Sequence, residues 1–319
     1  MKMKILSKTI TNIDQIKSRI GIADGLEVAL MGRAPTPEIT SILRDNFNIV
    51  NLETNDAFYK TPTYMLIDPF SKDEYLKNKS RSLIEDSFNV FLSLNNKGYF
   101  TVHNVSHCRQ EKRNYKLPSI LEIQDRRDSF HEYIRSLDDG KGLISLENVF
   151  PNTVNNCSYD YGDFGKLFED FPKDLGITFD LGHYTITLAM YAEGIKKQTQ
   201  DDFVSLRREI DFLSFMGSKE KELGKESAKG FVKEPSKGSL SDLVREKIGS
   251  LGERVKVIHC SNVMIIRDLY EDGFLDGVLD LNDIIRSSKA KHIVPEVVDK
   301  DYIKIDNQKK IINYLKSFL

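Results

Sequence analysis

The chain has 319 residues, of which 40% are hydrophobic and 29% charged, a composition typical of a globular protein with a sizeable core. Its 46 Lys and Arg residues are balanced by 48 Asp and Glu residues, so the basic surplus that usually accompanies nucleic-acid binding is missing. No apolar run approaches the ~18–20 residues that span a bilayer, and residues 1–20 lack the apolar core of a signal peptide. We therefore expect a cytoplasmic protein whose partner is neither a membrane nor a nucleic acid.

Short apolar runs recur along the whole chain and are predicted to be strands. In chain order they are KMKILSK (2–8), GLEVALMG (25–32), FNIVNLET (47–54), GYFTVHNV (98–105), GLISLENV (142–149), GITFDLGH (176–183), RVKVIHCSN (254–262) and KHIVPEVVD (291–299). The stretches between them show helical spacing, as in Leu83, Ile84 and Phe88, and in Leu281, Ile284 and Ile285. Strands that alternate with helices indicate a parallel sheet built from βα units.

Seven such units, or eight if KMKILSK is counted, in 319 residues predict a single-domain (β/α)8 TIM barrel over residues 1–319. An open doubly wound sheet is the main alternative, but no Gly-x-Gly-x-x-Gly motif follows an early strand and no P-loop motif is present. Residues 217–240 are rich in Gly, Ser, Lys and Glu and interrupt the pattern, so we predict a flexible insertion there. Its composition fits either a lid over the site or a plain solvated loop.

The three cysteines, Cys108, Cys157 and Cys260, are widely spaced and form no Cys-x-x-Cys pair. This spacing indicates neither a disulfide framework nor a thiolate zinc site. Cys260 follows a histidine, but a lone cysteine is more commonly a small buried apolar residue, and we expect that role for it.

The predicted strands share a feature at their C-terminal ends, where polar side chains that can bind metals follow the apolar run. These side chains are His103, Glu147, Asp180 with His183, His259 with Asn262, and Glu296. In a parallel barrel all C-terminal strand ends open on one face, where barrel enzymes build their active sites. We therefore expect these side chains to converge in space.

One subset of these residues has the chemistry of a metal centre. It comprises Glu147, Asp180, His259 and Glu296. Three carboxylates in one small space repel one another unless a cation neutralises them. Three carboxylates and one imidazole suit one divalent ion such as Mn²⁺, Mg²⁺, Co²⁺ or Zn²⁺, and leave coordination positions open for a substrate. Glu27, inside the second run, could line the floor of this site or form a buried salt bridge.

The order and spacing of three motifs, SLEN (145–148), TFDLGH (178–183) and VKVIHCSN (255–262), together with Glu296, resemble those of the xylose isomerase-like TIM-barrel superfamily. The resemblance covers roughly residues 25–300. That superfamily includes sugar isomerases and epimerases, inosose dehydratases and endonuclease IV. The resemblance implies that the four residues of the subset bind one metal ion. It also implies that Glu147 and Glu296 exchange protons with the substrate on opposite faces.

The same resemblance bears on further positions. It implies that His183 contacts the substrate or a further metal, and that His103 matches a histidine that ligates a second zinc in the endonuclease branch. Arg267 could take the part of an arginine that follows the histidine matching His259 in the epimerase branch, although its offset differs. Asn262 stands where many members have aspartate. Two further histidines of the endonuclease branch are missing here: Glu53 stands at one position, and the region shortly after His259 has no histidine.

The expected function is a divalent-metal-dependent sugar or sugar-phosphate isomerase or epimerase of carbohydrate metabolism, acting by proton transfer through a metal-stabilised enediolate. Glu147, Glu296 and His183 are its expected catalytic residues, and a small-molecule sugar or sugar phosphate is its expected partner. Two alternatives stay open. One is an endonuclease IV-like phosphodiesterase acting on abasic DNA, which needs two or three metals; the other is a non-catalytic metal- or sugar-binding barrel. The sequence indicates neither the individual substrate nor the oligomeric state.

Overall fold

A computed structural model describes most of the chain. The described residues are 2–54, 57–60, 63–94, 97–104, 120–149, 168–169, 171–185, 237–264, 267–269, 279–296 and 305–319. Most of the predicted insertion, residues 217–236, lies outside these ranges, as do Cys108, Cys157 and His107. Among the described helices, none is both long and apolar enough to cross a membrane.

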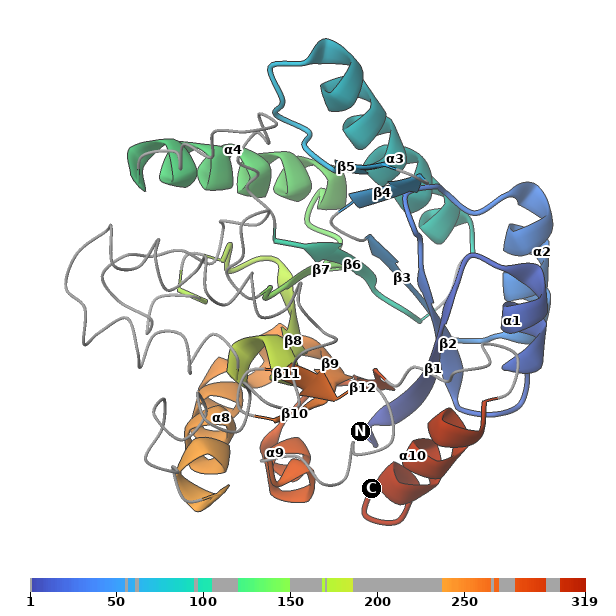
Figure 1. Ribbon diagram of the computed structural model, residues 1–319, viewed down its shortest axis with the longest axis vertical. Helices are drawn as coiled ribbons and strands as arrows, with labels where there is room; N and C mark the ends of the chain where they lie inside the picture. The colour runs from blue at the N-terminus through green and yellow to red at the C-terminus, as the bar shows by residue number, and fades with distance from the viewer. Residues whose placement is uncertain are drawn as a thin grey trace.

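Eight parallel strands form a closed barrel in which the order around the barrel follows the order along the chain (Figure 1). The strands are β1 (Lys4–Ile10), β2 (Gly25–Ala29), β3 (Val50–Thr54), β6 (Phe100–His103), β7 (Ile144–Glu147), β8 (Gly176–Asp180), β9 (Val255–Cys260) and β12 (His292–Pro295). Each falls within or overlaps one of the eight predicted runs. The pairing of β1 with β12 closes the barrel, and the predicted (β/α)8 TIM-barrel fold is confirmed.

Helices surround the barrel on its outer side (Figure 1). They are α1 (Ile13–Ser18), α2 (Pro37–Asn46), α3 (Glu74–Ser93), α4 (Ile120–Asp138), α8 (Lys237–Leu251), α9 (Leu281–Ser287) and α10 (Asp306–Lys316), with a short 3-10 turn η2 (Gly252–Arg254) after α8. The apolar face of α3 packs on the barrel through Phe88 and Phe91, whose ring centroids lie 5.4 and 6.0 Å from that of Phe100 in β6. At the start of α3, Asp73 accepts hydrogen bonds from the backbone N–H groups of Tyr75 and Leu76, which caps the helix.

Two antiparallel hairpins were not predicted from the sequence. The first joins β4 (Ala57–Lys60) to β5 (Thr63–Leu66) and follows β3; the second joins β10 (Asn262–Met264) to β11 (Arg267–Leu269) and follows β9. Both therefore extend from the C-terminal ends of barrel strands, where the βα loops of a TIM barrel surround the site.

The hydrophobic core has two parts. The larger part fills the space between the strands and the surrounding helices. The smaller part is a separate cluster of Leu6, Ile49, Tyr99, Val257 and Val294, which lie at or near the beginnings of strands. These residues come from strands on several sides of the barrel, so the cluster fills the inside of its N-terminal end. Burial of apolar area contributes roughly 25 cal/mol per Å², so this cluster both closes and stabilises that end.

A tight turn fixes the start of β7, the strand that carries Glu147. The carboxylate of Asp138 is buried and accepts hydrogen bonds from the backbone N–H groups of Gly142, Leu143 and Ile144 at 2.7–2.9 Å. Gly142 has φ 66°, a left-handed conformation that favours glycine. The sequence Asp-Asp-Gly-Lys-Gly thus sets the register at which β7 enters the barrel.

Candidate active site

All eight barrel strands place a charged or imidazole side chain toward the C-terminal half of the barrel. These side chains belong to Lys8, Glu27, Glu53, His103, Glu147, Asp180, His259 and Glu296. Contacts between strands that are not neighbours show that the side chains point inward. For example, His259 Nε2 of β9 lies 2.9 Å from Glu27 Oε1 of β2. The predicted convergence of strand-end residues is therefore observed.

A layer of hydroxyl groups lies two residues earlier on three of these strands. Thr101, Ser145 and Thr178 precede His103, Glu147 and Asp180, and their hydroxyl groups lie 2.7–3.3 Å from one another. Because side chains alternate between the two faces of a strand, residues i and i+2 point the same way. The charged side chains of β6, β7 and β8 consequently stand above a polar, hydrogen-bonded floor.

Three of the four predicted metal ligands form one compact group. Asp180, His259 and Glu296 each offer a ligand atom, and these atoms lie within 4.8 Å of one another. Glu147 joins them through His259, whose Nδ1 lies 3.2 Å from Glu147 Oε2 and 3.3 Å from Glu296 Oε1. All four residues are buried, with Glu296 the most exposed at 9%. The predicted ligand set is therefore brought together.

His183 lies beside this group on the turn that follows β8. Its backbone N–H donates a hydrogen bond to Asp180 Oδ1 at 2.6 Å. Its Nδ1 lies 3.5 Å from Asp180 Oδ2 and 3.6 Å from Glu147 Oε1. The spacing Asp-x-x-His thus places the imidazole next to two predicted ligands, where it can reach a bound substrate.

His103 lies on the other side of Glu147. Its Nε2 is 3.1 Å from Glu53 Oε1 and 3.4 Å from Glu147 Oε2. The structure thus brings His103 into the same cluster as the predicted ligands. The side chains of Asn262 and Arg267 lie outside the described part of the chain, so their predicted roles stay predictions.

Burial and opposite charges together set the ionisation of the cluster. Burial acts to raise the pKa of Glu147, but His259 and His103 outweigh it and hold that pKa well below its ordinary value. Burial acts to lower the pKa of His259, but Glu147 and Glu27 outweigh it and raise that pKa well above its ordinary value. The pKa of Glu296 is lowered because Lys8 and His259 outweigh the effect of burial. The carboxyl groups of Glu147 and Glu296 are therefore held in their ionised form.

Three charged residues of the cluster were not assigned to the site from the sequence. Lys8 was not considered, Glu53 was noted only as a departure from the endonuclease pattern, and Glu27 had two open interpretations. The structure places Glu27 in both roles: its carboxylate lies in the cluster, and its Oε1 is 3.5 Å from Lys8 Nζ. The available signal for each of these three residues was a charged side chain within an otherwise apolar run.

The unsatisfied donors and acceptors of the cluster fit a metal ion. Within the described residues, both ring nitrogens of His259 and one oxygen each of Glu27 and Glu147 are buried without a hydrogen-bond partner. Buried polar atoms without partners are costly, and coordination to a cation is one way to satisfy them. Carboxylate oxygens with one imidazole nitrogen suit Mn²⁺, Mg²⁺, Co²⁺ or Zn²⁺. The residues present therefore fit the predicted divalent ion.

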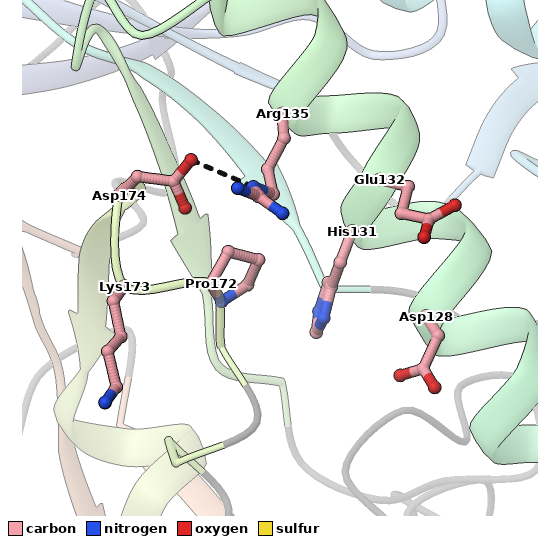
Figure 2. Close-up of a pocket in the computed structure, with 7 residues that line it drawn as sticks. All are labelled: Asp128, His131, Glu132, Arg135, Pro172, Lys173 and Asp174. Atoms are coloured by element: carbon pink, nitrogen blue, oxygen red, sulfur yellow. Dashed lines mark hydrogen bonds and ion pairs between the residues drawn. The ribbon is translucent and has the colours of Figure 1, made fainter.

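A separate hollow lies on the outer side of the barrel and is distinct from this cluster. Figure 2 shows it between α4 and the segment Pro172–Asp174, with Arg135 paired to Asp174 across one edge. None of the residues that line it belongs to the charged cluster. His131, on its wall, lies 2.9 Å from Asn104 Oδ1 through Nε2. Cys260 is buried, as expected.

Several solved structures with the same architecture carry the names of sugar epimerases or of an epimerase-like protein. A D-tagatose 3-epimerase-like protein superposes with a TM-score of 0.58 at 14% identity, over 99% of this chain and 98% of that chain. The chain has the fold of the xylose isomerase-like epimerases. The E. coli 3-keto-D-glucoside 4-epimerase, in its apo form, gives a TM-score of 0.53 at 12% identity, over 99% of this chain and all (100%) of that chain.

A D-allulose 3-epimerase from Methylomonas sp., solved in complex with D-allulose, gives a TM-score of 0.53 at 11% identity, over 100% of this chain and 98% of that chain. The predicted resemblance is thus confirmed for the fold, and at these identities the likeness to the three structures concerns the fold alone. No family model matches the chain, and no curated protein sequence does.

Proposed function

We propose that the protein is a divalent-metal-dependent isomerase or epimerase that acts on a sugar or sugar phosphate. The observation that carries the proposal is the position of two glutamates around one histidine. Glu147 Oε2 and Glu296 Oε1 lie 3.2 and 3.3 Å from the same atom, Nδ1 of His259. They come from β7 and from the end of β12, which are separated by β8 and β9 in the barrel. A substrate bound between them would present one face to each glutamate.

The metal ligands in this proposal are Glu147, Asp180, His259 and Glu296. Asp180, His259 and Glu296 form one compact group, and Glu147 contacts His259 beside it. A divalent ion held there would polarise the carbonyl group of a hydroxy-carbonyl substrate as a Lewis acid.

The glutamates would then transfer the protons. The substrate C–H bond next to the carbonyl group breaks, its proton moves to the carboxylate of Glu147 or Glu296, and the electron pair forms the enediolate. For epimerisation the opposite glutamate takes up a proton from solvent and delivers it to the other face of the same carbon, which inverts that carbon, and the first glutamate then releases its proton to solvent. For isomerisation the first glutamate returns its proton to the former carbonyl carbon, while a proton moves between the two oxygen atoms of the enediolate. Both glutamates are held ionised by the charges around them, so either can accept the first proton. His183, next to Glu147, would orient a substrate hydroxyl group.

The fold supports a sugar as substrate. The similar structures carry the names of epimerases of ketoses and keto-glucosides, and one of them contains D-allulose. Hydroxyl-rich substrates also suit a site whose wall consists of carboxylates, imidazoles and an ammonium group, because each can bond to a hydroxyl group.

Two measurements test the proposal. The purified protein is chelated, reloaded with Mn²⁺, Co²⁺, Mg²⁺ or Zn²⁺ in turn, and its metal content is measured by elemental analysis. The loaded protein is then incubated with a panel of ketoses and ketose phosphates in D₂O. We expect about one ion per chain and incorporation of deuterium next to the carbonyl group of at least one ketose. A folded protein that holds no divalent ion would contradict the proposal.

One observation favours a second candidate, a metal-dependent phosphodiesterase. Glu53, His103 and Glu147 form a further group whose ligand atoms lie within 4.8 Å of one another, and hydrolysis of phosphodiesters commonly uses two metal ions about 3.5–4 Å apart. Two or three tightly held zinc ions, with cleavage of DNA that contains abasic sites, would support this candidate. A non-catalytic barrel would instead bind the ion or the sugar without solvent exchange.

A further inference from the structure

Lys8 lies inside the charged cluster, where its ammonium group contacts three carboxylates. Nζ is 2.7 Å from Glu53 Oε2 and 3.5 Å from Glu27 Oε1, and it donates a hydrogen bond to Glu296 Oε1. Only 18% of the side chain is exposed. The backbone of Lys8 is fixed from outside the barrel, because Gln308 Nε2 of α10 donates a hydrogen bond to its carbonyl oxygen at 2.6 Å.

The groups around Lys8 form a place for a cation in their own right. Glu27, Glu53 and His259 offer ligand atoms within 4.8 Å of one another. Glu27 Oε1 and His259 Nε2 are 2.9 Å apart, and neither has a hydrogen-bond partner among the described residues although both side chains are fully buried. Lys8 Nζ faces this group through its contact with Glu27 Oε1.

Glu53 belongs to two of the further groups that could hold an ion, one with Glu27 and His259 and one with His103 and Glu147. The remaining group, Glu147, Asp180 and His183, shares two residues with the proposed site and does not contain Glu53. Lys8 is bonded to the carboxylate of Glu53 at 2.7 Å. An ammonium group bonded to a carboxylate oxygen keeps a divalent ion from binding to that same oxygen atom. At Glu296 the contact of Lys8 is with Oε1, so Oε2 stays available to the ion of the proposed function.

The cluster carries more negative charge than one divalent ion neutralises, so a cationic side chain such as that of Lys8 stabilises it. Five carboxylates meet in it, those of Glu27, Glu53, Glu147, Asp180 and Glu296. One divalent ion neutralises two of the five negative charges, and the remainder favours a further cation. Because an ammonium group cannot dissociate from the chain, it supplies that charge without raising the number of metal ions.

We propose that Lys8 occupies the position of a second divalent ion, and thereby restricts the centre to the single ion of the proposed function. The wild-type count of one ion rests on that proposed function, whereas the effect of removing Lys8 does not. A lysine at this position would set the barrel apart from centres that use two metal ions for hydrolysis.

The test compares metal content among matched variants after equilibrium dialysis against Mn²⁺ or Zn²⁺. Lys8→Met removes the ammonium group but keeps the length of the side chain. Lys4→Met is the control, because Lys4 lies on the same strand but is 45% exposed and pairs with Asp24 away from the cluster. We expect Lys8→Met to bind one ion more per chain than the wild type, and Lys4→Met to match the wild type. The double variant Lys8→Met, Glu53→Gln should return to the wild-type count.

An equal count in Lys8→Met and in the wild type would overturn the proposal. Glu53→Gln in the wild-type background gives a second test, which does not require Lys8→Met to fold. It should bind as many ions as the wild type, since Glu53 is the partner of Lys8 and not of a metal, and loss of an ion would overturn the proposal. The absolute count in the wild type tests the proposed function, whereas the differences test Lys8, so the two can fail separately.

Discussion

Asn148 and Asp180 are joined by two reciprocal hydrogen bonds. Asn148 Nδ2 donates to the carbonyl oxygen of Asp180 at 3.0 Å, and the backbone N–H of Asp180 donates to Asn148 Oδ1 at 2.8 Å. Asn148 directly follows Glu147, so this pair ties the end of β7 to the end of β8 and fixes two proposed metal ligands relative to each other.

Replacement of Asn148 by Ala should therefore weaken metal binding although Asn148 is not a proposed ligand. Loss of the groups that orient metal ligands typically costs about 10–100-fold in metal affinity. Two buried backbone groups would also lose their partners, which should lower the free energy of unfolding by about 1–3 kcal/mol. Titration with Mn²⁺ and urea denaturation measure the two effects. Asn46→Ala, at an exposed asparagine of α2, is the control, and an unchanged affinity in Asn148→Ala would contradict the argument.

Glu147→Gln and Glu296→Gln should each slow proton exchange by about 10²–10⁴-fold, because general acid–base catalysis commonly contributes that much. If each glutamate serves one face, the slowing in each variant should concern only the epimer whose proton that glutamate removes. Deuterium exchange into the other epimer should continue. The measurement is deuterium incorporation into both epimers by NMR, at metal loading verified for each variant. Full exchange into both epimers in either variant would exclude that glutamate as a base.

Gly25→Ala should destabilise the fold at the first residue of β2. An added Cβ would lie 2.5 Å from the carbonyl oxygen of Ile49 and 2.7 Å from its Cβ, so backbone would have to move. Overpacking of this kind costs typically about 1–3 kcal/mol. Gly249→Ala in α8 is the matched control, because nothing lies within 4 Å of its added Cβ. Since glycine in a helix costs roughly 0.5–1 kcal/mol relative to alanine, that variant should be more stable than the wild type. Urea denaturation should show a lower free energy of unfolding for Gly25→Ala and a higher one for Gly249→Ala than for the wild type.

His292 should make stability depend on pH below neutrality. Burial lowers the pKa of His292 to about 4, Lys291 lowers it further, and Asp24 acts in the opposite direction. The ordinary pKa is 6.5, so the unfolded chain takes up a proton at a higher pH than the folded protein. The contribution of the neutral side chain is therefore complete above about pH 6.5 and is lost as the pH falls toward 4.

The expected loss is about 3 kcal/mol, since one pKa unit corresponds to about 1.4 kcal/mol. His292→Asn keeps a donor for Asn51 Oδ1, which lies 3.2 Å from His292 Nδ1, but does not titrate. The difference in unfolding free energy between the wild type and this variant should therefore shrink by that amount between pH 7 and pH 4, in metal-free buffer. A difference that is independent of pH would show that His292 does not carry the effect.

The strands and their order could be predicted because short apolar runs that alternate with helical stretches are compatible with few folds other than a parallel βα barrel or an open parallel sheet. The hairpin β4–β5 was not predicted because each of its strands has only four residues, and both lie in the stretch between β3 and α3. Glu27 illustrates a different limit: the apolar run that contains it continues to residue 32, whereas β2 ends at Ala29, so the true end of the strand was hidden.

Among the described residues, the side chains predicted to converge do lie together, but the prediction covered only residue types that ligate metals. Lys8 ends the predicted run KMKILSK, yet an ammonium group cannot ligate a metal and so lies outside that prediction. Its role depends on the closure of the barrel, which brings β1 next to β12, and on the curvature of the sheet, which lets Lys8 reach Glu53 on β3, two strands away. Contacts of that kind join residues up to 288 positions apart, and no local pattern of residues encodes them.

The hydroxyl groups of Thr101, Ser145 and Thr178 form a triangle in which either member of each pair can be the donor. Its hydrogen atoms can therefore circulate in either of two senses while the oxygen atoms stay in place. These hydroxyl groups can reorient as water molecules do: their O–H dipoles can point toward the side of the cluster that carries more negative charge, and can reverse when a proton transfer moves that charge. The interior of this barrel can thus adapt to a shifting proton without any movement of its strands.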